Sequence, residues 1–240
     1  MRRRSSRGGL VIAVVGVALA AVVATAAART TTHSAAKPIT IGWAFDSKGA
    51  MAPFDTPALA AAKIRVAQIN KRGGVLGRPL QIKTCDTQGN KPAVAKACAL
   101  KLLGGGANVM FTTCDVDLGA PVVQEAINRG VLAVSPCIGT DQMGPKRFGP
   151  KGKLAFSFGN VAQDEGSAMA QYAWAKGWRT AALATDGVIV YFKDVIAAFK
   201  WRWQKLGGKI VDQETYHSLG GNDVNNAVSR LNNVKADVVV

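Results

Sequence analysis

Strand-like and helix-like segments alternate from residue 39 to residue 240, and this alternation constrains the fold more than any other feature. The strand-like segments are short apolar runs at 39–43, 80–84, 109–112, 131–134, 154–158, 180–184, 209–211 and 236–240. Apolar residues at helical spacing lie between most of them, at 58–70, 92–103, 118–129, 163–176, 191–206 and 224–233. Because apolar strands alternating with helices form parallel sheets covered on both faces, the sequence predicts an α/β fold with doubly wound sheets.

A connection rich in Gly, Pro and Lys at 135–153 separates two groups of these segments. The next strand-like run is followed by Gly159, which we interpret as a break or hinge. We therefore expect a first α/β lobe over 39–158 and a second over 159–240. The last apolar run stops at the end of the given sequence, so we expect the second lobe to be incomplete.

Proline and glycine are used to place the ends of the first helix. Pro53 and Pro57 precede the helical spacing and are predicted to lie in a loop. Gly73 and Gly74 follow that spacing, and glycine readily adopts the left-handed conformation that ends helices. The first helix is therefore predicted to occupy 58–70.

The first 28 residues have the features of a secretory signal peptide. Four arginines precede an apolar run at 10–23, and small residues follow it at 24–28. A membrane anchor is the alternative, but this run is shorter than the ~20 residues needed to span a bilayer. We expect a cleaved signal peptide over 1–28, a polar tether over 29–38, and export to the periplasm or the outside of the cell envelope.

The charge balance restricts the partners of the exported chain. The formal net charge is +15, and removal of residues 1–28, which hold four arginines and no acid, leaves +11. Such a chain is attracted to anionic lipid headgroups and cell-wall polymers, so peripheral association with either is expected. The basic residues are scattered and form no aromatic-interleaved basic motif, which argues against nucleic acid as a partner.

The four cysteines are Cys85, Cys98, Cys114 and Cys137. Their spacing lacks a CxxC pair and nearby histidines, so no metal site is expected. In an exported protein an even number of cysteines favours disulfides, and four cysteines allow three pairings.

The sequence offers little for covalent chemistry. It has two histidines, His33 and His217, and neither lies in a recognisable motif. No G-x-S-x-G, HExxH or phosphate-binding G-x-x-x-x-G-K-[ST] pattern occurs. We therefore expect no catalytic residue and no cofactor, and interpret the chain as a binding protein rather than an enzyme.

The stretch at 69–80, Ile-Asn-Lys-Arg-Gly-Gly-Val-Leu-Gly-Arg-Pro-Leu, resembles a signature of type I periplasmic binding proteins. The similarity is to the group that binds Leu, Ile and Val and serves ABC importers, and it continues through 85–88, 130–132, 135–136 and 206–208. The resemblance implies two lobes joined by a hinge, with a small polar solute held between them and delivered to an ABC permease. A ligand-binding sensor domain of a signalling system with the same fold is the alternative.

The resemblance, together with the rule that open α/β sheets bind ligands beyond the carboxyl ends of their strands, implies a set of ligand contacts. They are Trp43, Phe45, Phe54, Asp115, Asp117, Ser135, Cys137 and Tyr191. Some have a structural alternative: Trp43 and Phe45 as buried strand-end residues, Asp117 as a helix N-cap, and Tyr191 as a cap of the following helix.

Asp115 departs from the family pattern. The amino-acid-binding relatives resemble one another in having a serine there, whose hydroxyl helps to hold the carboxylate of the ligand. A carboxylate at this position would repel an anion, so the departure favours a cationic or polyhydroxy ligand over an ordinary α-amino acid. Cys137 and Ile138 also replace the small residues usual in the neighbouring loop.

The resemblance also favours one disulfide pairing. The Leu/Ile/Val-binding relatives join the ends of the second and third strands, which corresponds here to Cys85–Cys114 and leaves Cys98 with Cys137. The competing set is Cys85–Cys98 with Cys114–Cys137, which would tie two of the predicted contact loops directly.

Overall fold

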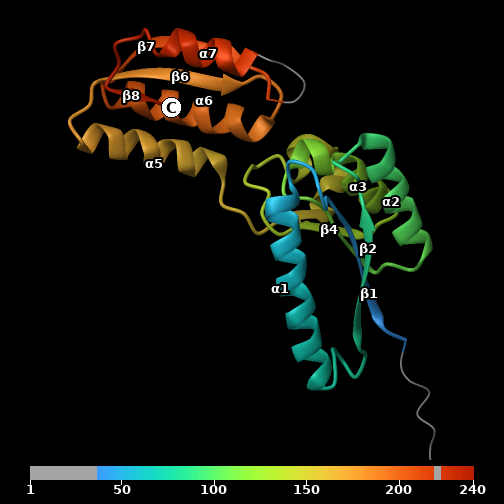
Figure 1. The fold of residues 1–240 in the computed structure, drawn as a ribbon. Coiled ribbons are helices and arrows are strands. Elements are labelled where there is room, and N and C mark those ends of the chain that lie inside the picture. Colours follow the sequence, from blue (N-terminus) through green and yellow to red (C-terminus); the bar gives the residue numbers. More distant parts are fainter. Residues whose placement is uncertain (1–36, 219–222) are drawn as a thin grey trace, which may run out of the picture. The chain divides into compact units, whose positions relative to one another are not determined.

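The computed structural model describes residues 37–218 and 223–240 (Figure 1). The predicted signal peptide and most of the predicted tether lie outside these residues. Within the two described ranges, no helix has the length and apolar character needed to cross a membrane.

The first sheet is parallel, and its order is β2-β1-β3-β4-β5. Its strands are β1 (Ile39–Phe45), β2 (Leu80–Asp86), β3 (Val109–Phe111), β4 (Leu132–Ser135) and β5 (Ala155–Ser157). The chain runs from β1 outward to β2 and then returns past β1 to β3. The predicted doubly wound topology is confirmed, and its switch point lies between β1 and β3.

Helices cover both faces of this sheet (Figure 1). They are α1 (Ala52–Lys71), α2 (Pro92–Gly104), α3 (Val116–Asn128), the short α4 (Pro145–Phe148) and the 3₁₀ helix η1 (Gly149–Leu154). One core cluster joins α2 and α3 to the strands through buried side chains such as Leu102, Met110, Val123 and Ile127.

The expectation that Pro53 and Pro57 lie in a loop is wrong. The helix α1 begins at Ala52, so Pro53 stands in the first turn, where its missing N–H costs nothing. Pro57 lies inside the helix and removes one i→i−4 hydrogen bond. The helix continues because Asp55 and Leu59, one turn apart, are both buried against the rest of the lobe.

The second sheet is also parallel, in the order β7-β6-β8. Its strands are β6 (Thr180–Asp186), β7 (Lys209–Tyr216) and β8 (Val238–Val239), and its helices are α5 (Ala162–Ala175), α6 (Val190–Lys205) and α7 (Asp223–Leu231). Phe199 and Trp203 of α6 are fully buried in its core beside Leu183. The predicted helices and strands of this half are present, with ends shifted from those predicted.

The helices α5 and α6 approach closely at Gly166. A Cβ atom added there would lie 2.9 Å from the backbone nitrogen of Phe199 and would also overlap the carbonyl oxygen of Val195. We predict that Gly166→Ala lowers the free energy of unfolding by about 1–3 kcal/mol, because a packed core tolerates added volume poorly. Urea denaturation followed by circular dichroism measures this loss.

Gly104→Ala is the matched control for this substitution. Gly104 is the last residue of α2, and a Cβ atom there meets nothing within 4 Å. This variant should be as stable as the parent or more stable by about 0.4–1 kcal/mol. Equal unfolding midpoints for the two variants would contradict the close packing of α5 on α6.

Candidate functional site

The carboxyl ends of β1 to β4 meet at one edge of the first sheet because the strands are parallel. The first polar residue after β1 is Asp46, which is completely buried. Its carboxylate accepts hydrogen bonds from the backbone N–H groups of Lys48 (3.2 Å), Gly49 (2.8 Å), Met51 (3.2 Å) and Gly89 (3.1 Å). Asp46 therefore folds the loop after β1 and ties it to the loop after β2.

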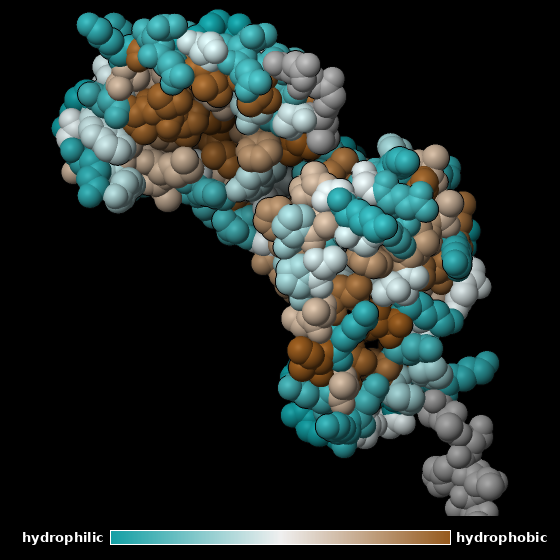
Figure 2. Space-filling model, viewed as in Figure 1, coloured by the Kyte–Doolittle hydropathy of each residue, from teal (hydrophilic) through white to brown (hydrophobic). Residues whose placement is uncertain are grey.

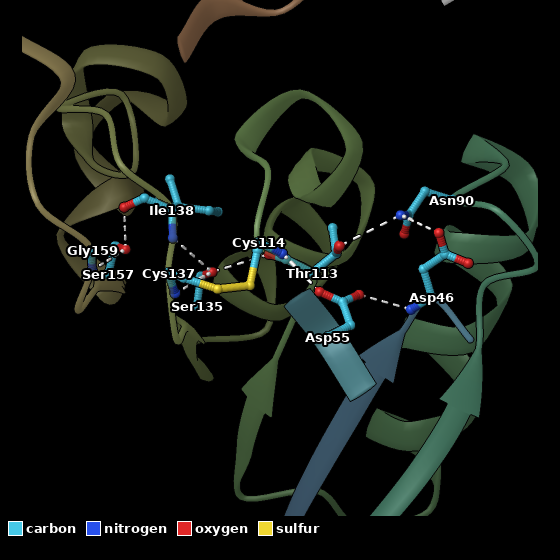
Figure 3. The surroundings of a disulfide bond; sticks show 10 residues. All are labelled: Asp46, Asp55, Asn90, Thr113, Cys114, Ser135, Cys137, Ile138, Ser157 and Gly159. Atoms are coloured by element: carbon cyan, nitrogen blue, oxygen red, sulfur yellow. Dashed lines mark hydrogen bonds between the residues drawn. A yellow bond between two sulfur atoms is a disulfide. The ribbon is translucent and has the colours of Figure 1, made fainter. Parts of the chain in front are cut away.

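Asp55, on the first turns of α1, is a second buried carboxylate at this edge and is 1% exposed. It accepts hydrogen bonds from the backbone nitrogens of Asp46 (2.8 Å) and Cys114 (3.1 Å), as Figure 3 shows. Burial raises the pKa of Asp55 above its ordinary value, and the hydrogen bonds it accepts partly oppose this rise. Asp55 thus joins α1 to the ends of β1 and β3.

Asn90 and its neighbours connect the loop after β2 to the same network. The Thr87 hydroxyl donates to the Asn90 side-chain oxygen (2.8 Å), and the Asn90 amide donates to the Thr113 hydroxyl (3.4 Å). All three side chains are buried. The helix α1 and the loops after β1, β2 and β3 are therefore fixed to one another by hydrogen bonds at the sheet edge.

The disulfides are Cys85–Cys98 and Cys114–Cys137, so the favoured pairing of Cys85 with Cys114 is wrong. The sheet order explains the difference, because β1 lies between β2 and β3. Cys85 and Cys114 are therefore about two strand spacings apart, roughly 9–10 Å, which exceeds the reach of a disulfide. Since β3 and β4 are neighbours, Cys114 and Cys137 come within 4.9 Å between Cα atoms.

Ser135 is the buried residue that organises the loop after β4. Its hydroxyl donates to the carbonyl oxygen of Thr113 (3.0 Å) and accepts from the backbone nitrogens of Ile138 (3.2 Å) and Cys137 (3.4 Å) (Figure 3). Ser135 and Cys137 therefore lie together at the predicted edge. Their contact with a ligand stays a prediction.

The three aromatic candidates of the first lobe differ in exposure. Trp43 is 2% exposed, and its ring packs against Phe111 with 4.7 Å between centroids. Trp43 is thus a buried residue of β1, as the alternative to ligand contact predicts. Phe45 is half-buried at the last residue of β1, and Phe54 is 55% exposed on α1. A role for each in ligand contact stays a prediction.

The two acids before and within α3 have separate roles. Asp115 is the N-cap of α3 and accepts a hydrogen bond from the backbone nitrogen of Leu118 (2.9 Å), and burial raises its pKa. The alternative of Asp117 as the N-cap is therefore wrong. Both carboxylate oxygens of Asp117 are engaged, one by Arg147 (2.7 Å) and one by the backbone nitrogen of Val190 (2.8 Å).

Tyr191 lies in the first turn of α6, and the N-cap of that helix is Ile189, so Tyr191 is not its cap. Its hydroxyl donates to Glu165 (2.7 Å). Burial and then Glu165 raise the pKa of Tyr191 to about 12. Its ring lies against Gly139, since a Cβ atom on that glycine would be 3.0 Å from the ring. Tyr191, the one ligand contact predicted for the second lobe, thus contacts the loop after β4.

Two hollows differ in their relation to this edge. One, of about 520 Å³, borders the loop after β4 at Ile138 and Thr140 and extends to Phe156 of β5. The other, of about 360 Å³, is apolar, is lined by residues such as Met169, Tyr172 and Val239, and contains none of the strand-end polar residues. Figure 2 shows the apolar character of that part of the surface.

Sequence reasoning missed Asp46, Asp55, Asn90 and Thr113. The position of Asp46 directly after a strand was a usable signal. Asp55 carries no such signal, because the prolines at 53 and 57 predict a loop around it. Within the described residues, no group of His, Cys, Asp and Glu side chains is arranged to hold a metal ion. The side chains of this network are buried and hydrogen-bonded to one another and to the backbone, so they fix the positions of the loops at the strand ends.

A family model described as periplasmic binding protein matches residues 38–240. The chain therefore belongs to the periplasmic binding protein family. Over 98 residues, 41% of this chain and 26% of the relative, it is 30% identical to the Leu/Ile/Val-binding protein BraC3 of Rhizobium johnstonii. The predicted family resemblance is confirmed.

Solved structures of similar fold include the substrate-binding protein LivJ of a branched-chain amino acid transporter from Streptococcus pneumoniae, in complex with isoleucine. It superposes with a TM-score of 0.72 at 22% identity, over 84% of this chain and 56% of LivJ. A solute-binding protein of an ABC transporter from Rhodopseudomonas palustris, in complex with 3,4-dihydroxybenzoic acid, gives 0.66 at 18% identity, over 85% and 53%. The chain spans about half the length of these proteins, and the likeness confirms the fold.

The raised pKa of Asp55 generates a pH-dependent prediction. Between pH 3.8 and the raised pKa, the folded protein binds more protons at Asp55 than the unfolded chain does. The contribution of Asp55 to the free energy of unfolding therefore falls as the pH rises through this range. The difference in unfolding free energy between the parent and Asp55→Asn, measured in urea from pH 3 to 7, should decrease with rising pH.

Asp86→Asn is the matched control, with the opposite sign. Hydrogen bonding from the Ser47 hydroxyl lowers the pKa of Asp86, which lies at the end of β2. Its contribution to stability is complete above pH 3.8 and is lost as the pH falls through the lowered pKa. The parent-minus-variant difference should therefore grow with pH for Asp86→Asn. The same slope for both variants would contradict a raised pKa of Asp55 in the folded protein.

Proposed function

We propose that this protein is the solute-binding component of an ABC importer, which captures a small polar solute outside the cytoplasm and delivers it to a permease. The observation that carries this proposal is the buried hydrogen-bond network that fixes four loops at the carboxyl edge of the first sheet. Open α/β sheets bind ligands at this edge, near the topological switch point. Membership of the periplasmic binding protein family supports the same function.

The proposed mechanism is closure of two lobes, 39–158 and 159–240, around one solute. The loop after β4 and Tyr191 of α6 already lie together, and we propose that both contact the solute. The connection between the lobes begins after β5 and is hydrogen-bonded to the same loop: the backbone nitrogen of Gly159 donates to the Ser157 hydroxyl (3.1 Å), which itself donates to the Ile138 carbonyl. A solute that contacts the loop can therefore favour one hinge conformation through its differential affinity.

The relatives and Asp115 support a proposal for the solute class. Branched-chain amino acids and benzoates are the ligands named for similar proteins. Asp115 places a buried carboxylate at the N-terminus of α3, where it takes up a backbone donor that an anionic ligand would need. We therefore propose cationic and polyhydroxy solutes as candidate ligands beside these two classes.

Thermal unfolding in the presence of single solutes tests the proposed function. The panel is leucine, isoleucine, benzoate, 3,4-dihydroxybenzoate, arginine, spermidine and glucose. A solute at 100 times its Kd stabilises the folded state by about 2.7 kcal/mol, which raises Tm by roughly 5–10 °C for a protein of this size. We expect one class to produce such a shift. The absence of a shift across the panel would contradict the proposal.

Substitution of Tyr191 tests its role in solute contact. Tyr191→Ala removes the ring that lies against Gly139, so the Kd of the solute found above should rise about tenfold or more. Isothermal titration calorimetry measures this change. Tyr172→Ala is the control, because Tyr172 is an exposed tyrosine of α5, at 61% exposure, and lies outside the strand-end loops. Unchanged affinity in both variants would remove Tyr191 from the site.

A further inference from the structure

The strands β3 and β4 end before the loops that we propose contact the solute. The last backbone hydrogen bond between them runs from the nitrogen of Thr112 to the carbonyl oxygen of Val134 (3.0 Å). One residue further on, a side chain replaces the backbone as donor: the Ser135 hydroxyl donates to the carbonyl oxygen of Thr113 (3.0 Å). Beyond the sheet, side chains therefore hold these two loops in register.

The Cys114–Cys137 disulfide is the next connection outward, with 4.9 Å between the Cα atoms. The backbone nitrogen of each of these two cysteines also donates a hydrogen bond. Cys114 donates to the Asp55 carboxylate (3.1 Å), and Cys137 donates to the Ser135 hydroxyl (3.4 Å). Figure 3 shows that the disulfide bridges the Asp55 network on one side and the loop after β4 on the other.

The Cys85–Cys98 disulfide has a different environment and supplies an internal comparison. It joins the end of β2 to α2, and Cys98 is 2% exposed within the core cluster of the first lobe. The Cys98 sulfur lies 3.4 Å from the carbonyl oxygen of Asp86, the last residue of β2. This disulfide therefore fastens a helix to the sheet inside the core.

Both disulfides should contribute similarly to global stability. Their sequence separations are 13 and 23 residues, and the loop-closure entropy that a disulfide removes from the unfolded chain grows only with the logarithm of this length. A difference in solute affinity between variants that lack one or the other would therefore report on local positioning rather than on stability.

We propose that the Cys114–Cys137 disulfide is a positioning element of the solute site, which holds the loop at 135–140 in its binding conformation. This inference rests on the proposed function, because it requires the solute to contact that loop. Without the disulfide, the Ser135 hydroxyl alone continues the β3–β4 register, and the loop samples other conformations. Solute binding must then restrict it again, which weakens affinity.

The first test compares two double variants, Cys114→Ser/Cys137→Ser and Cys85→Ser/Cys98→Ser. Both should lose a similar amount of Tm in the absence of solute. Only Cys114→Ser/Cys137→Ser should also bind more weakly, by about tenfold, the panel solute that gives the largest shift with the parent. An affinity equal to that of the parent in both variants, or an equal loss of affinity in both, would overturn the inference.

The second test keeps the parent sequence and does not depend on a known solute. Dithiothreitol transfers two electrons and two protons to a disulfide, which becomes two thiols, while the reagent becomes a cyclic disulfide. Alkylation with iodoacetamide and peptide mapping identify which pair has opened. Opening of Cys114–Cys137 should accelerate amide hydrogen exchange at 135–140 about tenfold, and reoxidation should reverse it. Unchanged exchange there would overturn the inference.

The two tests separate the two claims. If the parent binds no panel solute, the proposed function fails, and the exchange measurement still decides whether the disulfide positions the loop. If the parent binds a solute and exchange at 135–140 is the same with Cys114–Cys137 open or closed, the positioning role fails while the proposed function stands.

Discussion

The buried carboxylate of Asp55 joins three parts of the chain that are far apart in the sequence. It lies on α1 and accepts hydrogen bonds from the loop after β1, at Asp46, and from the loop after β3, at Cys114. A buried carboxylate without partners is costly, by about 1–3 kcal/mol or more for each lost hydrogen bond. The three segments therefore stay together at the strand ends.

The order of the strands decides what this edge contains. Because β1 lies between β2 and β3, the loops after these strands meet around Asp46, and the loop after β4 joins them through Ser135 and Cys137. The first turn of α6 brings Tyr191 against Gly139 of that last loop. Hydrogen bonds, one disulfide and one aromatic contact thus gather residues from both sheets at one place.

The sequence predicts the elements well because apolar periodicity is a local property, as the stripe of Val195, Phe199 and Trp203 on α6 illustrates. The start of α1 was missed because prolines suggest a loop, whereas the burial of Asp55 depends on contacts with distant strands. The disulfide pairing failed for the same reason, since it follows from the strand order. The sequence suggests Asp117 as an N-cap, whereas α3 begins two residues earlier and Asp115 is its N-cap, because local spacing defines helix boundaries poorly.

The central claim is that a solute binds at the strand-end edge organised by Asp55. Amide chemical-shift mapping by NMR, with and without the solute that stabilises the protein, tests it most directly. The account predicts the largest changes at 46–51, 112–117 and 135–140, with the core residues of α2 unaffected. Changes confined to the apolar hollow around Met169, Tyr172 and Val239 would contradict it.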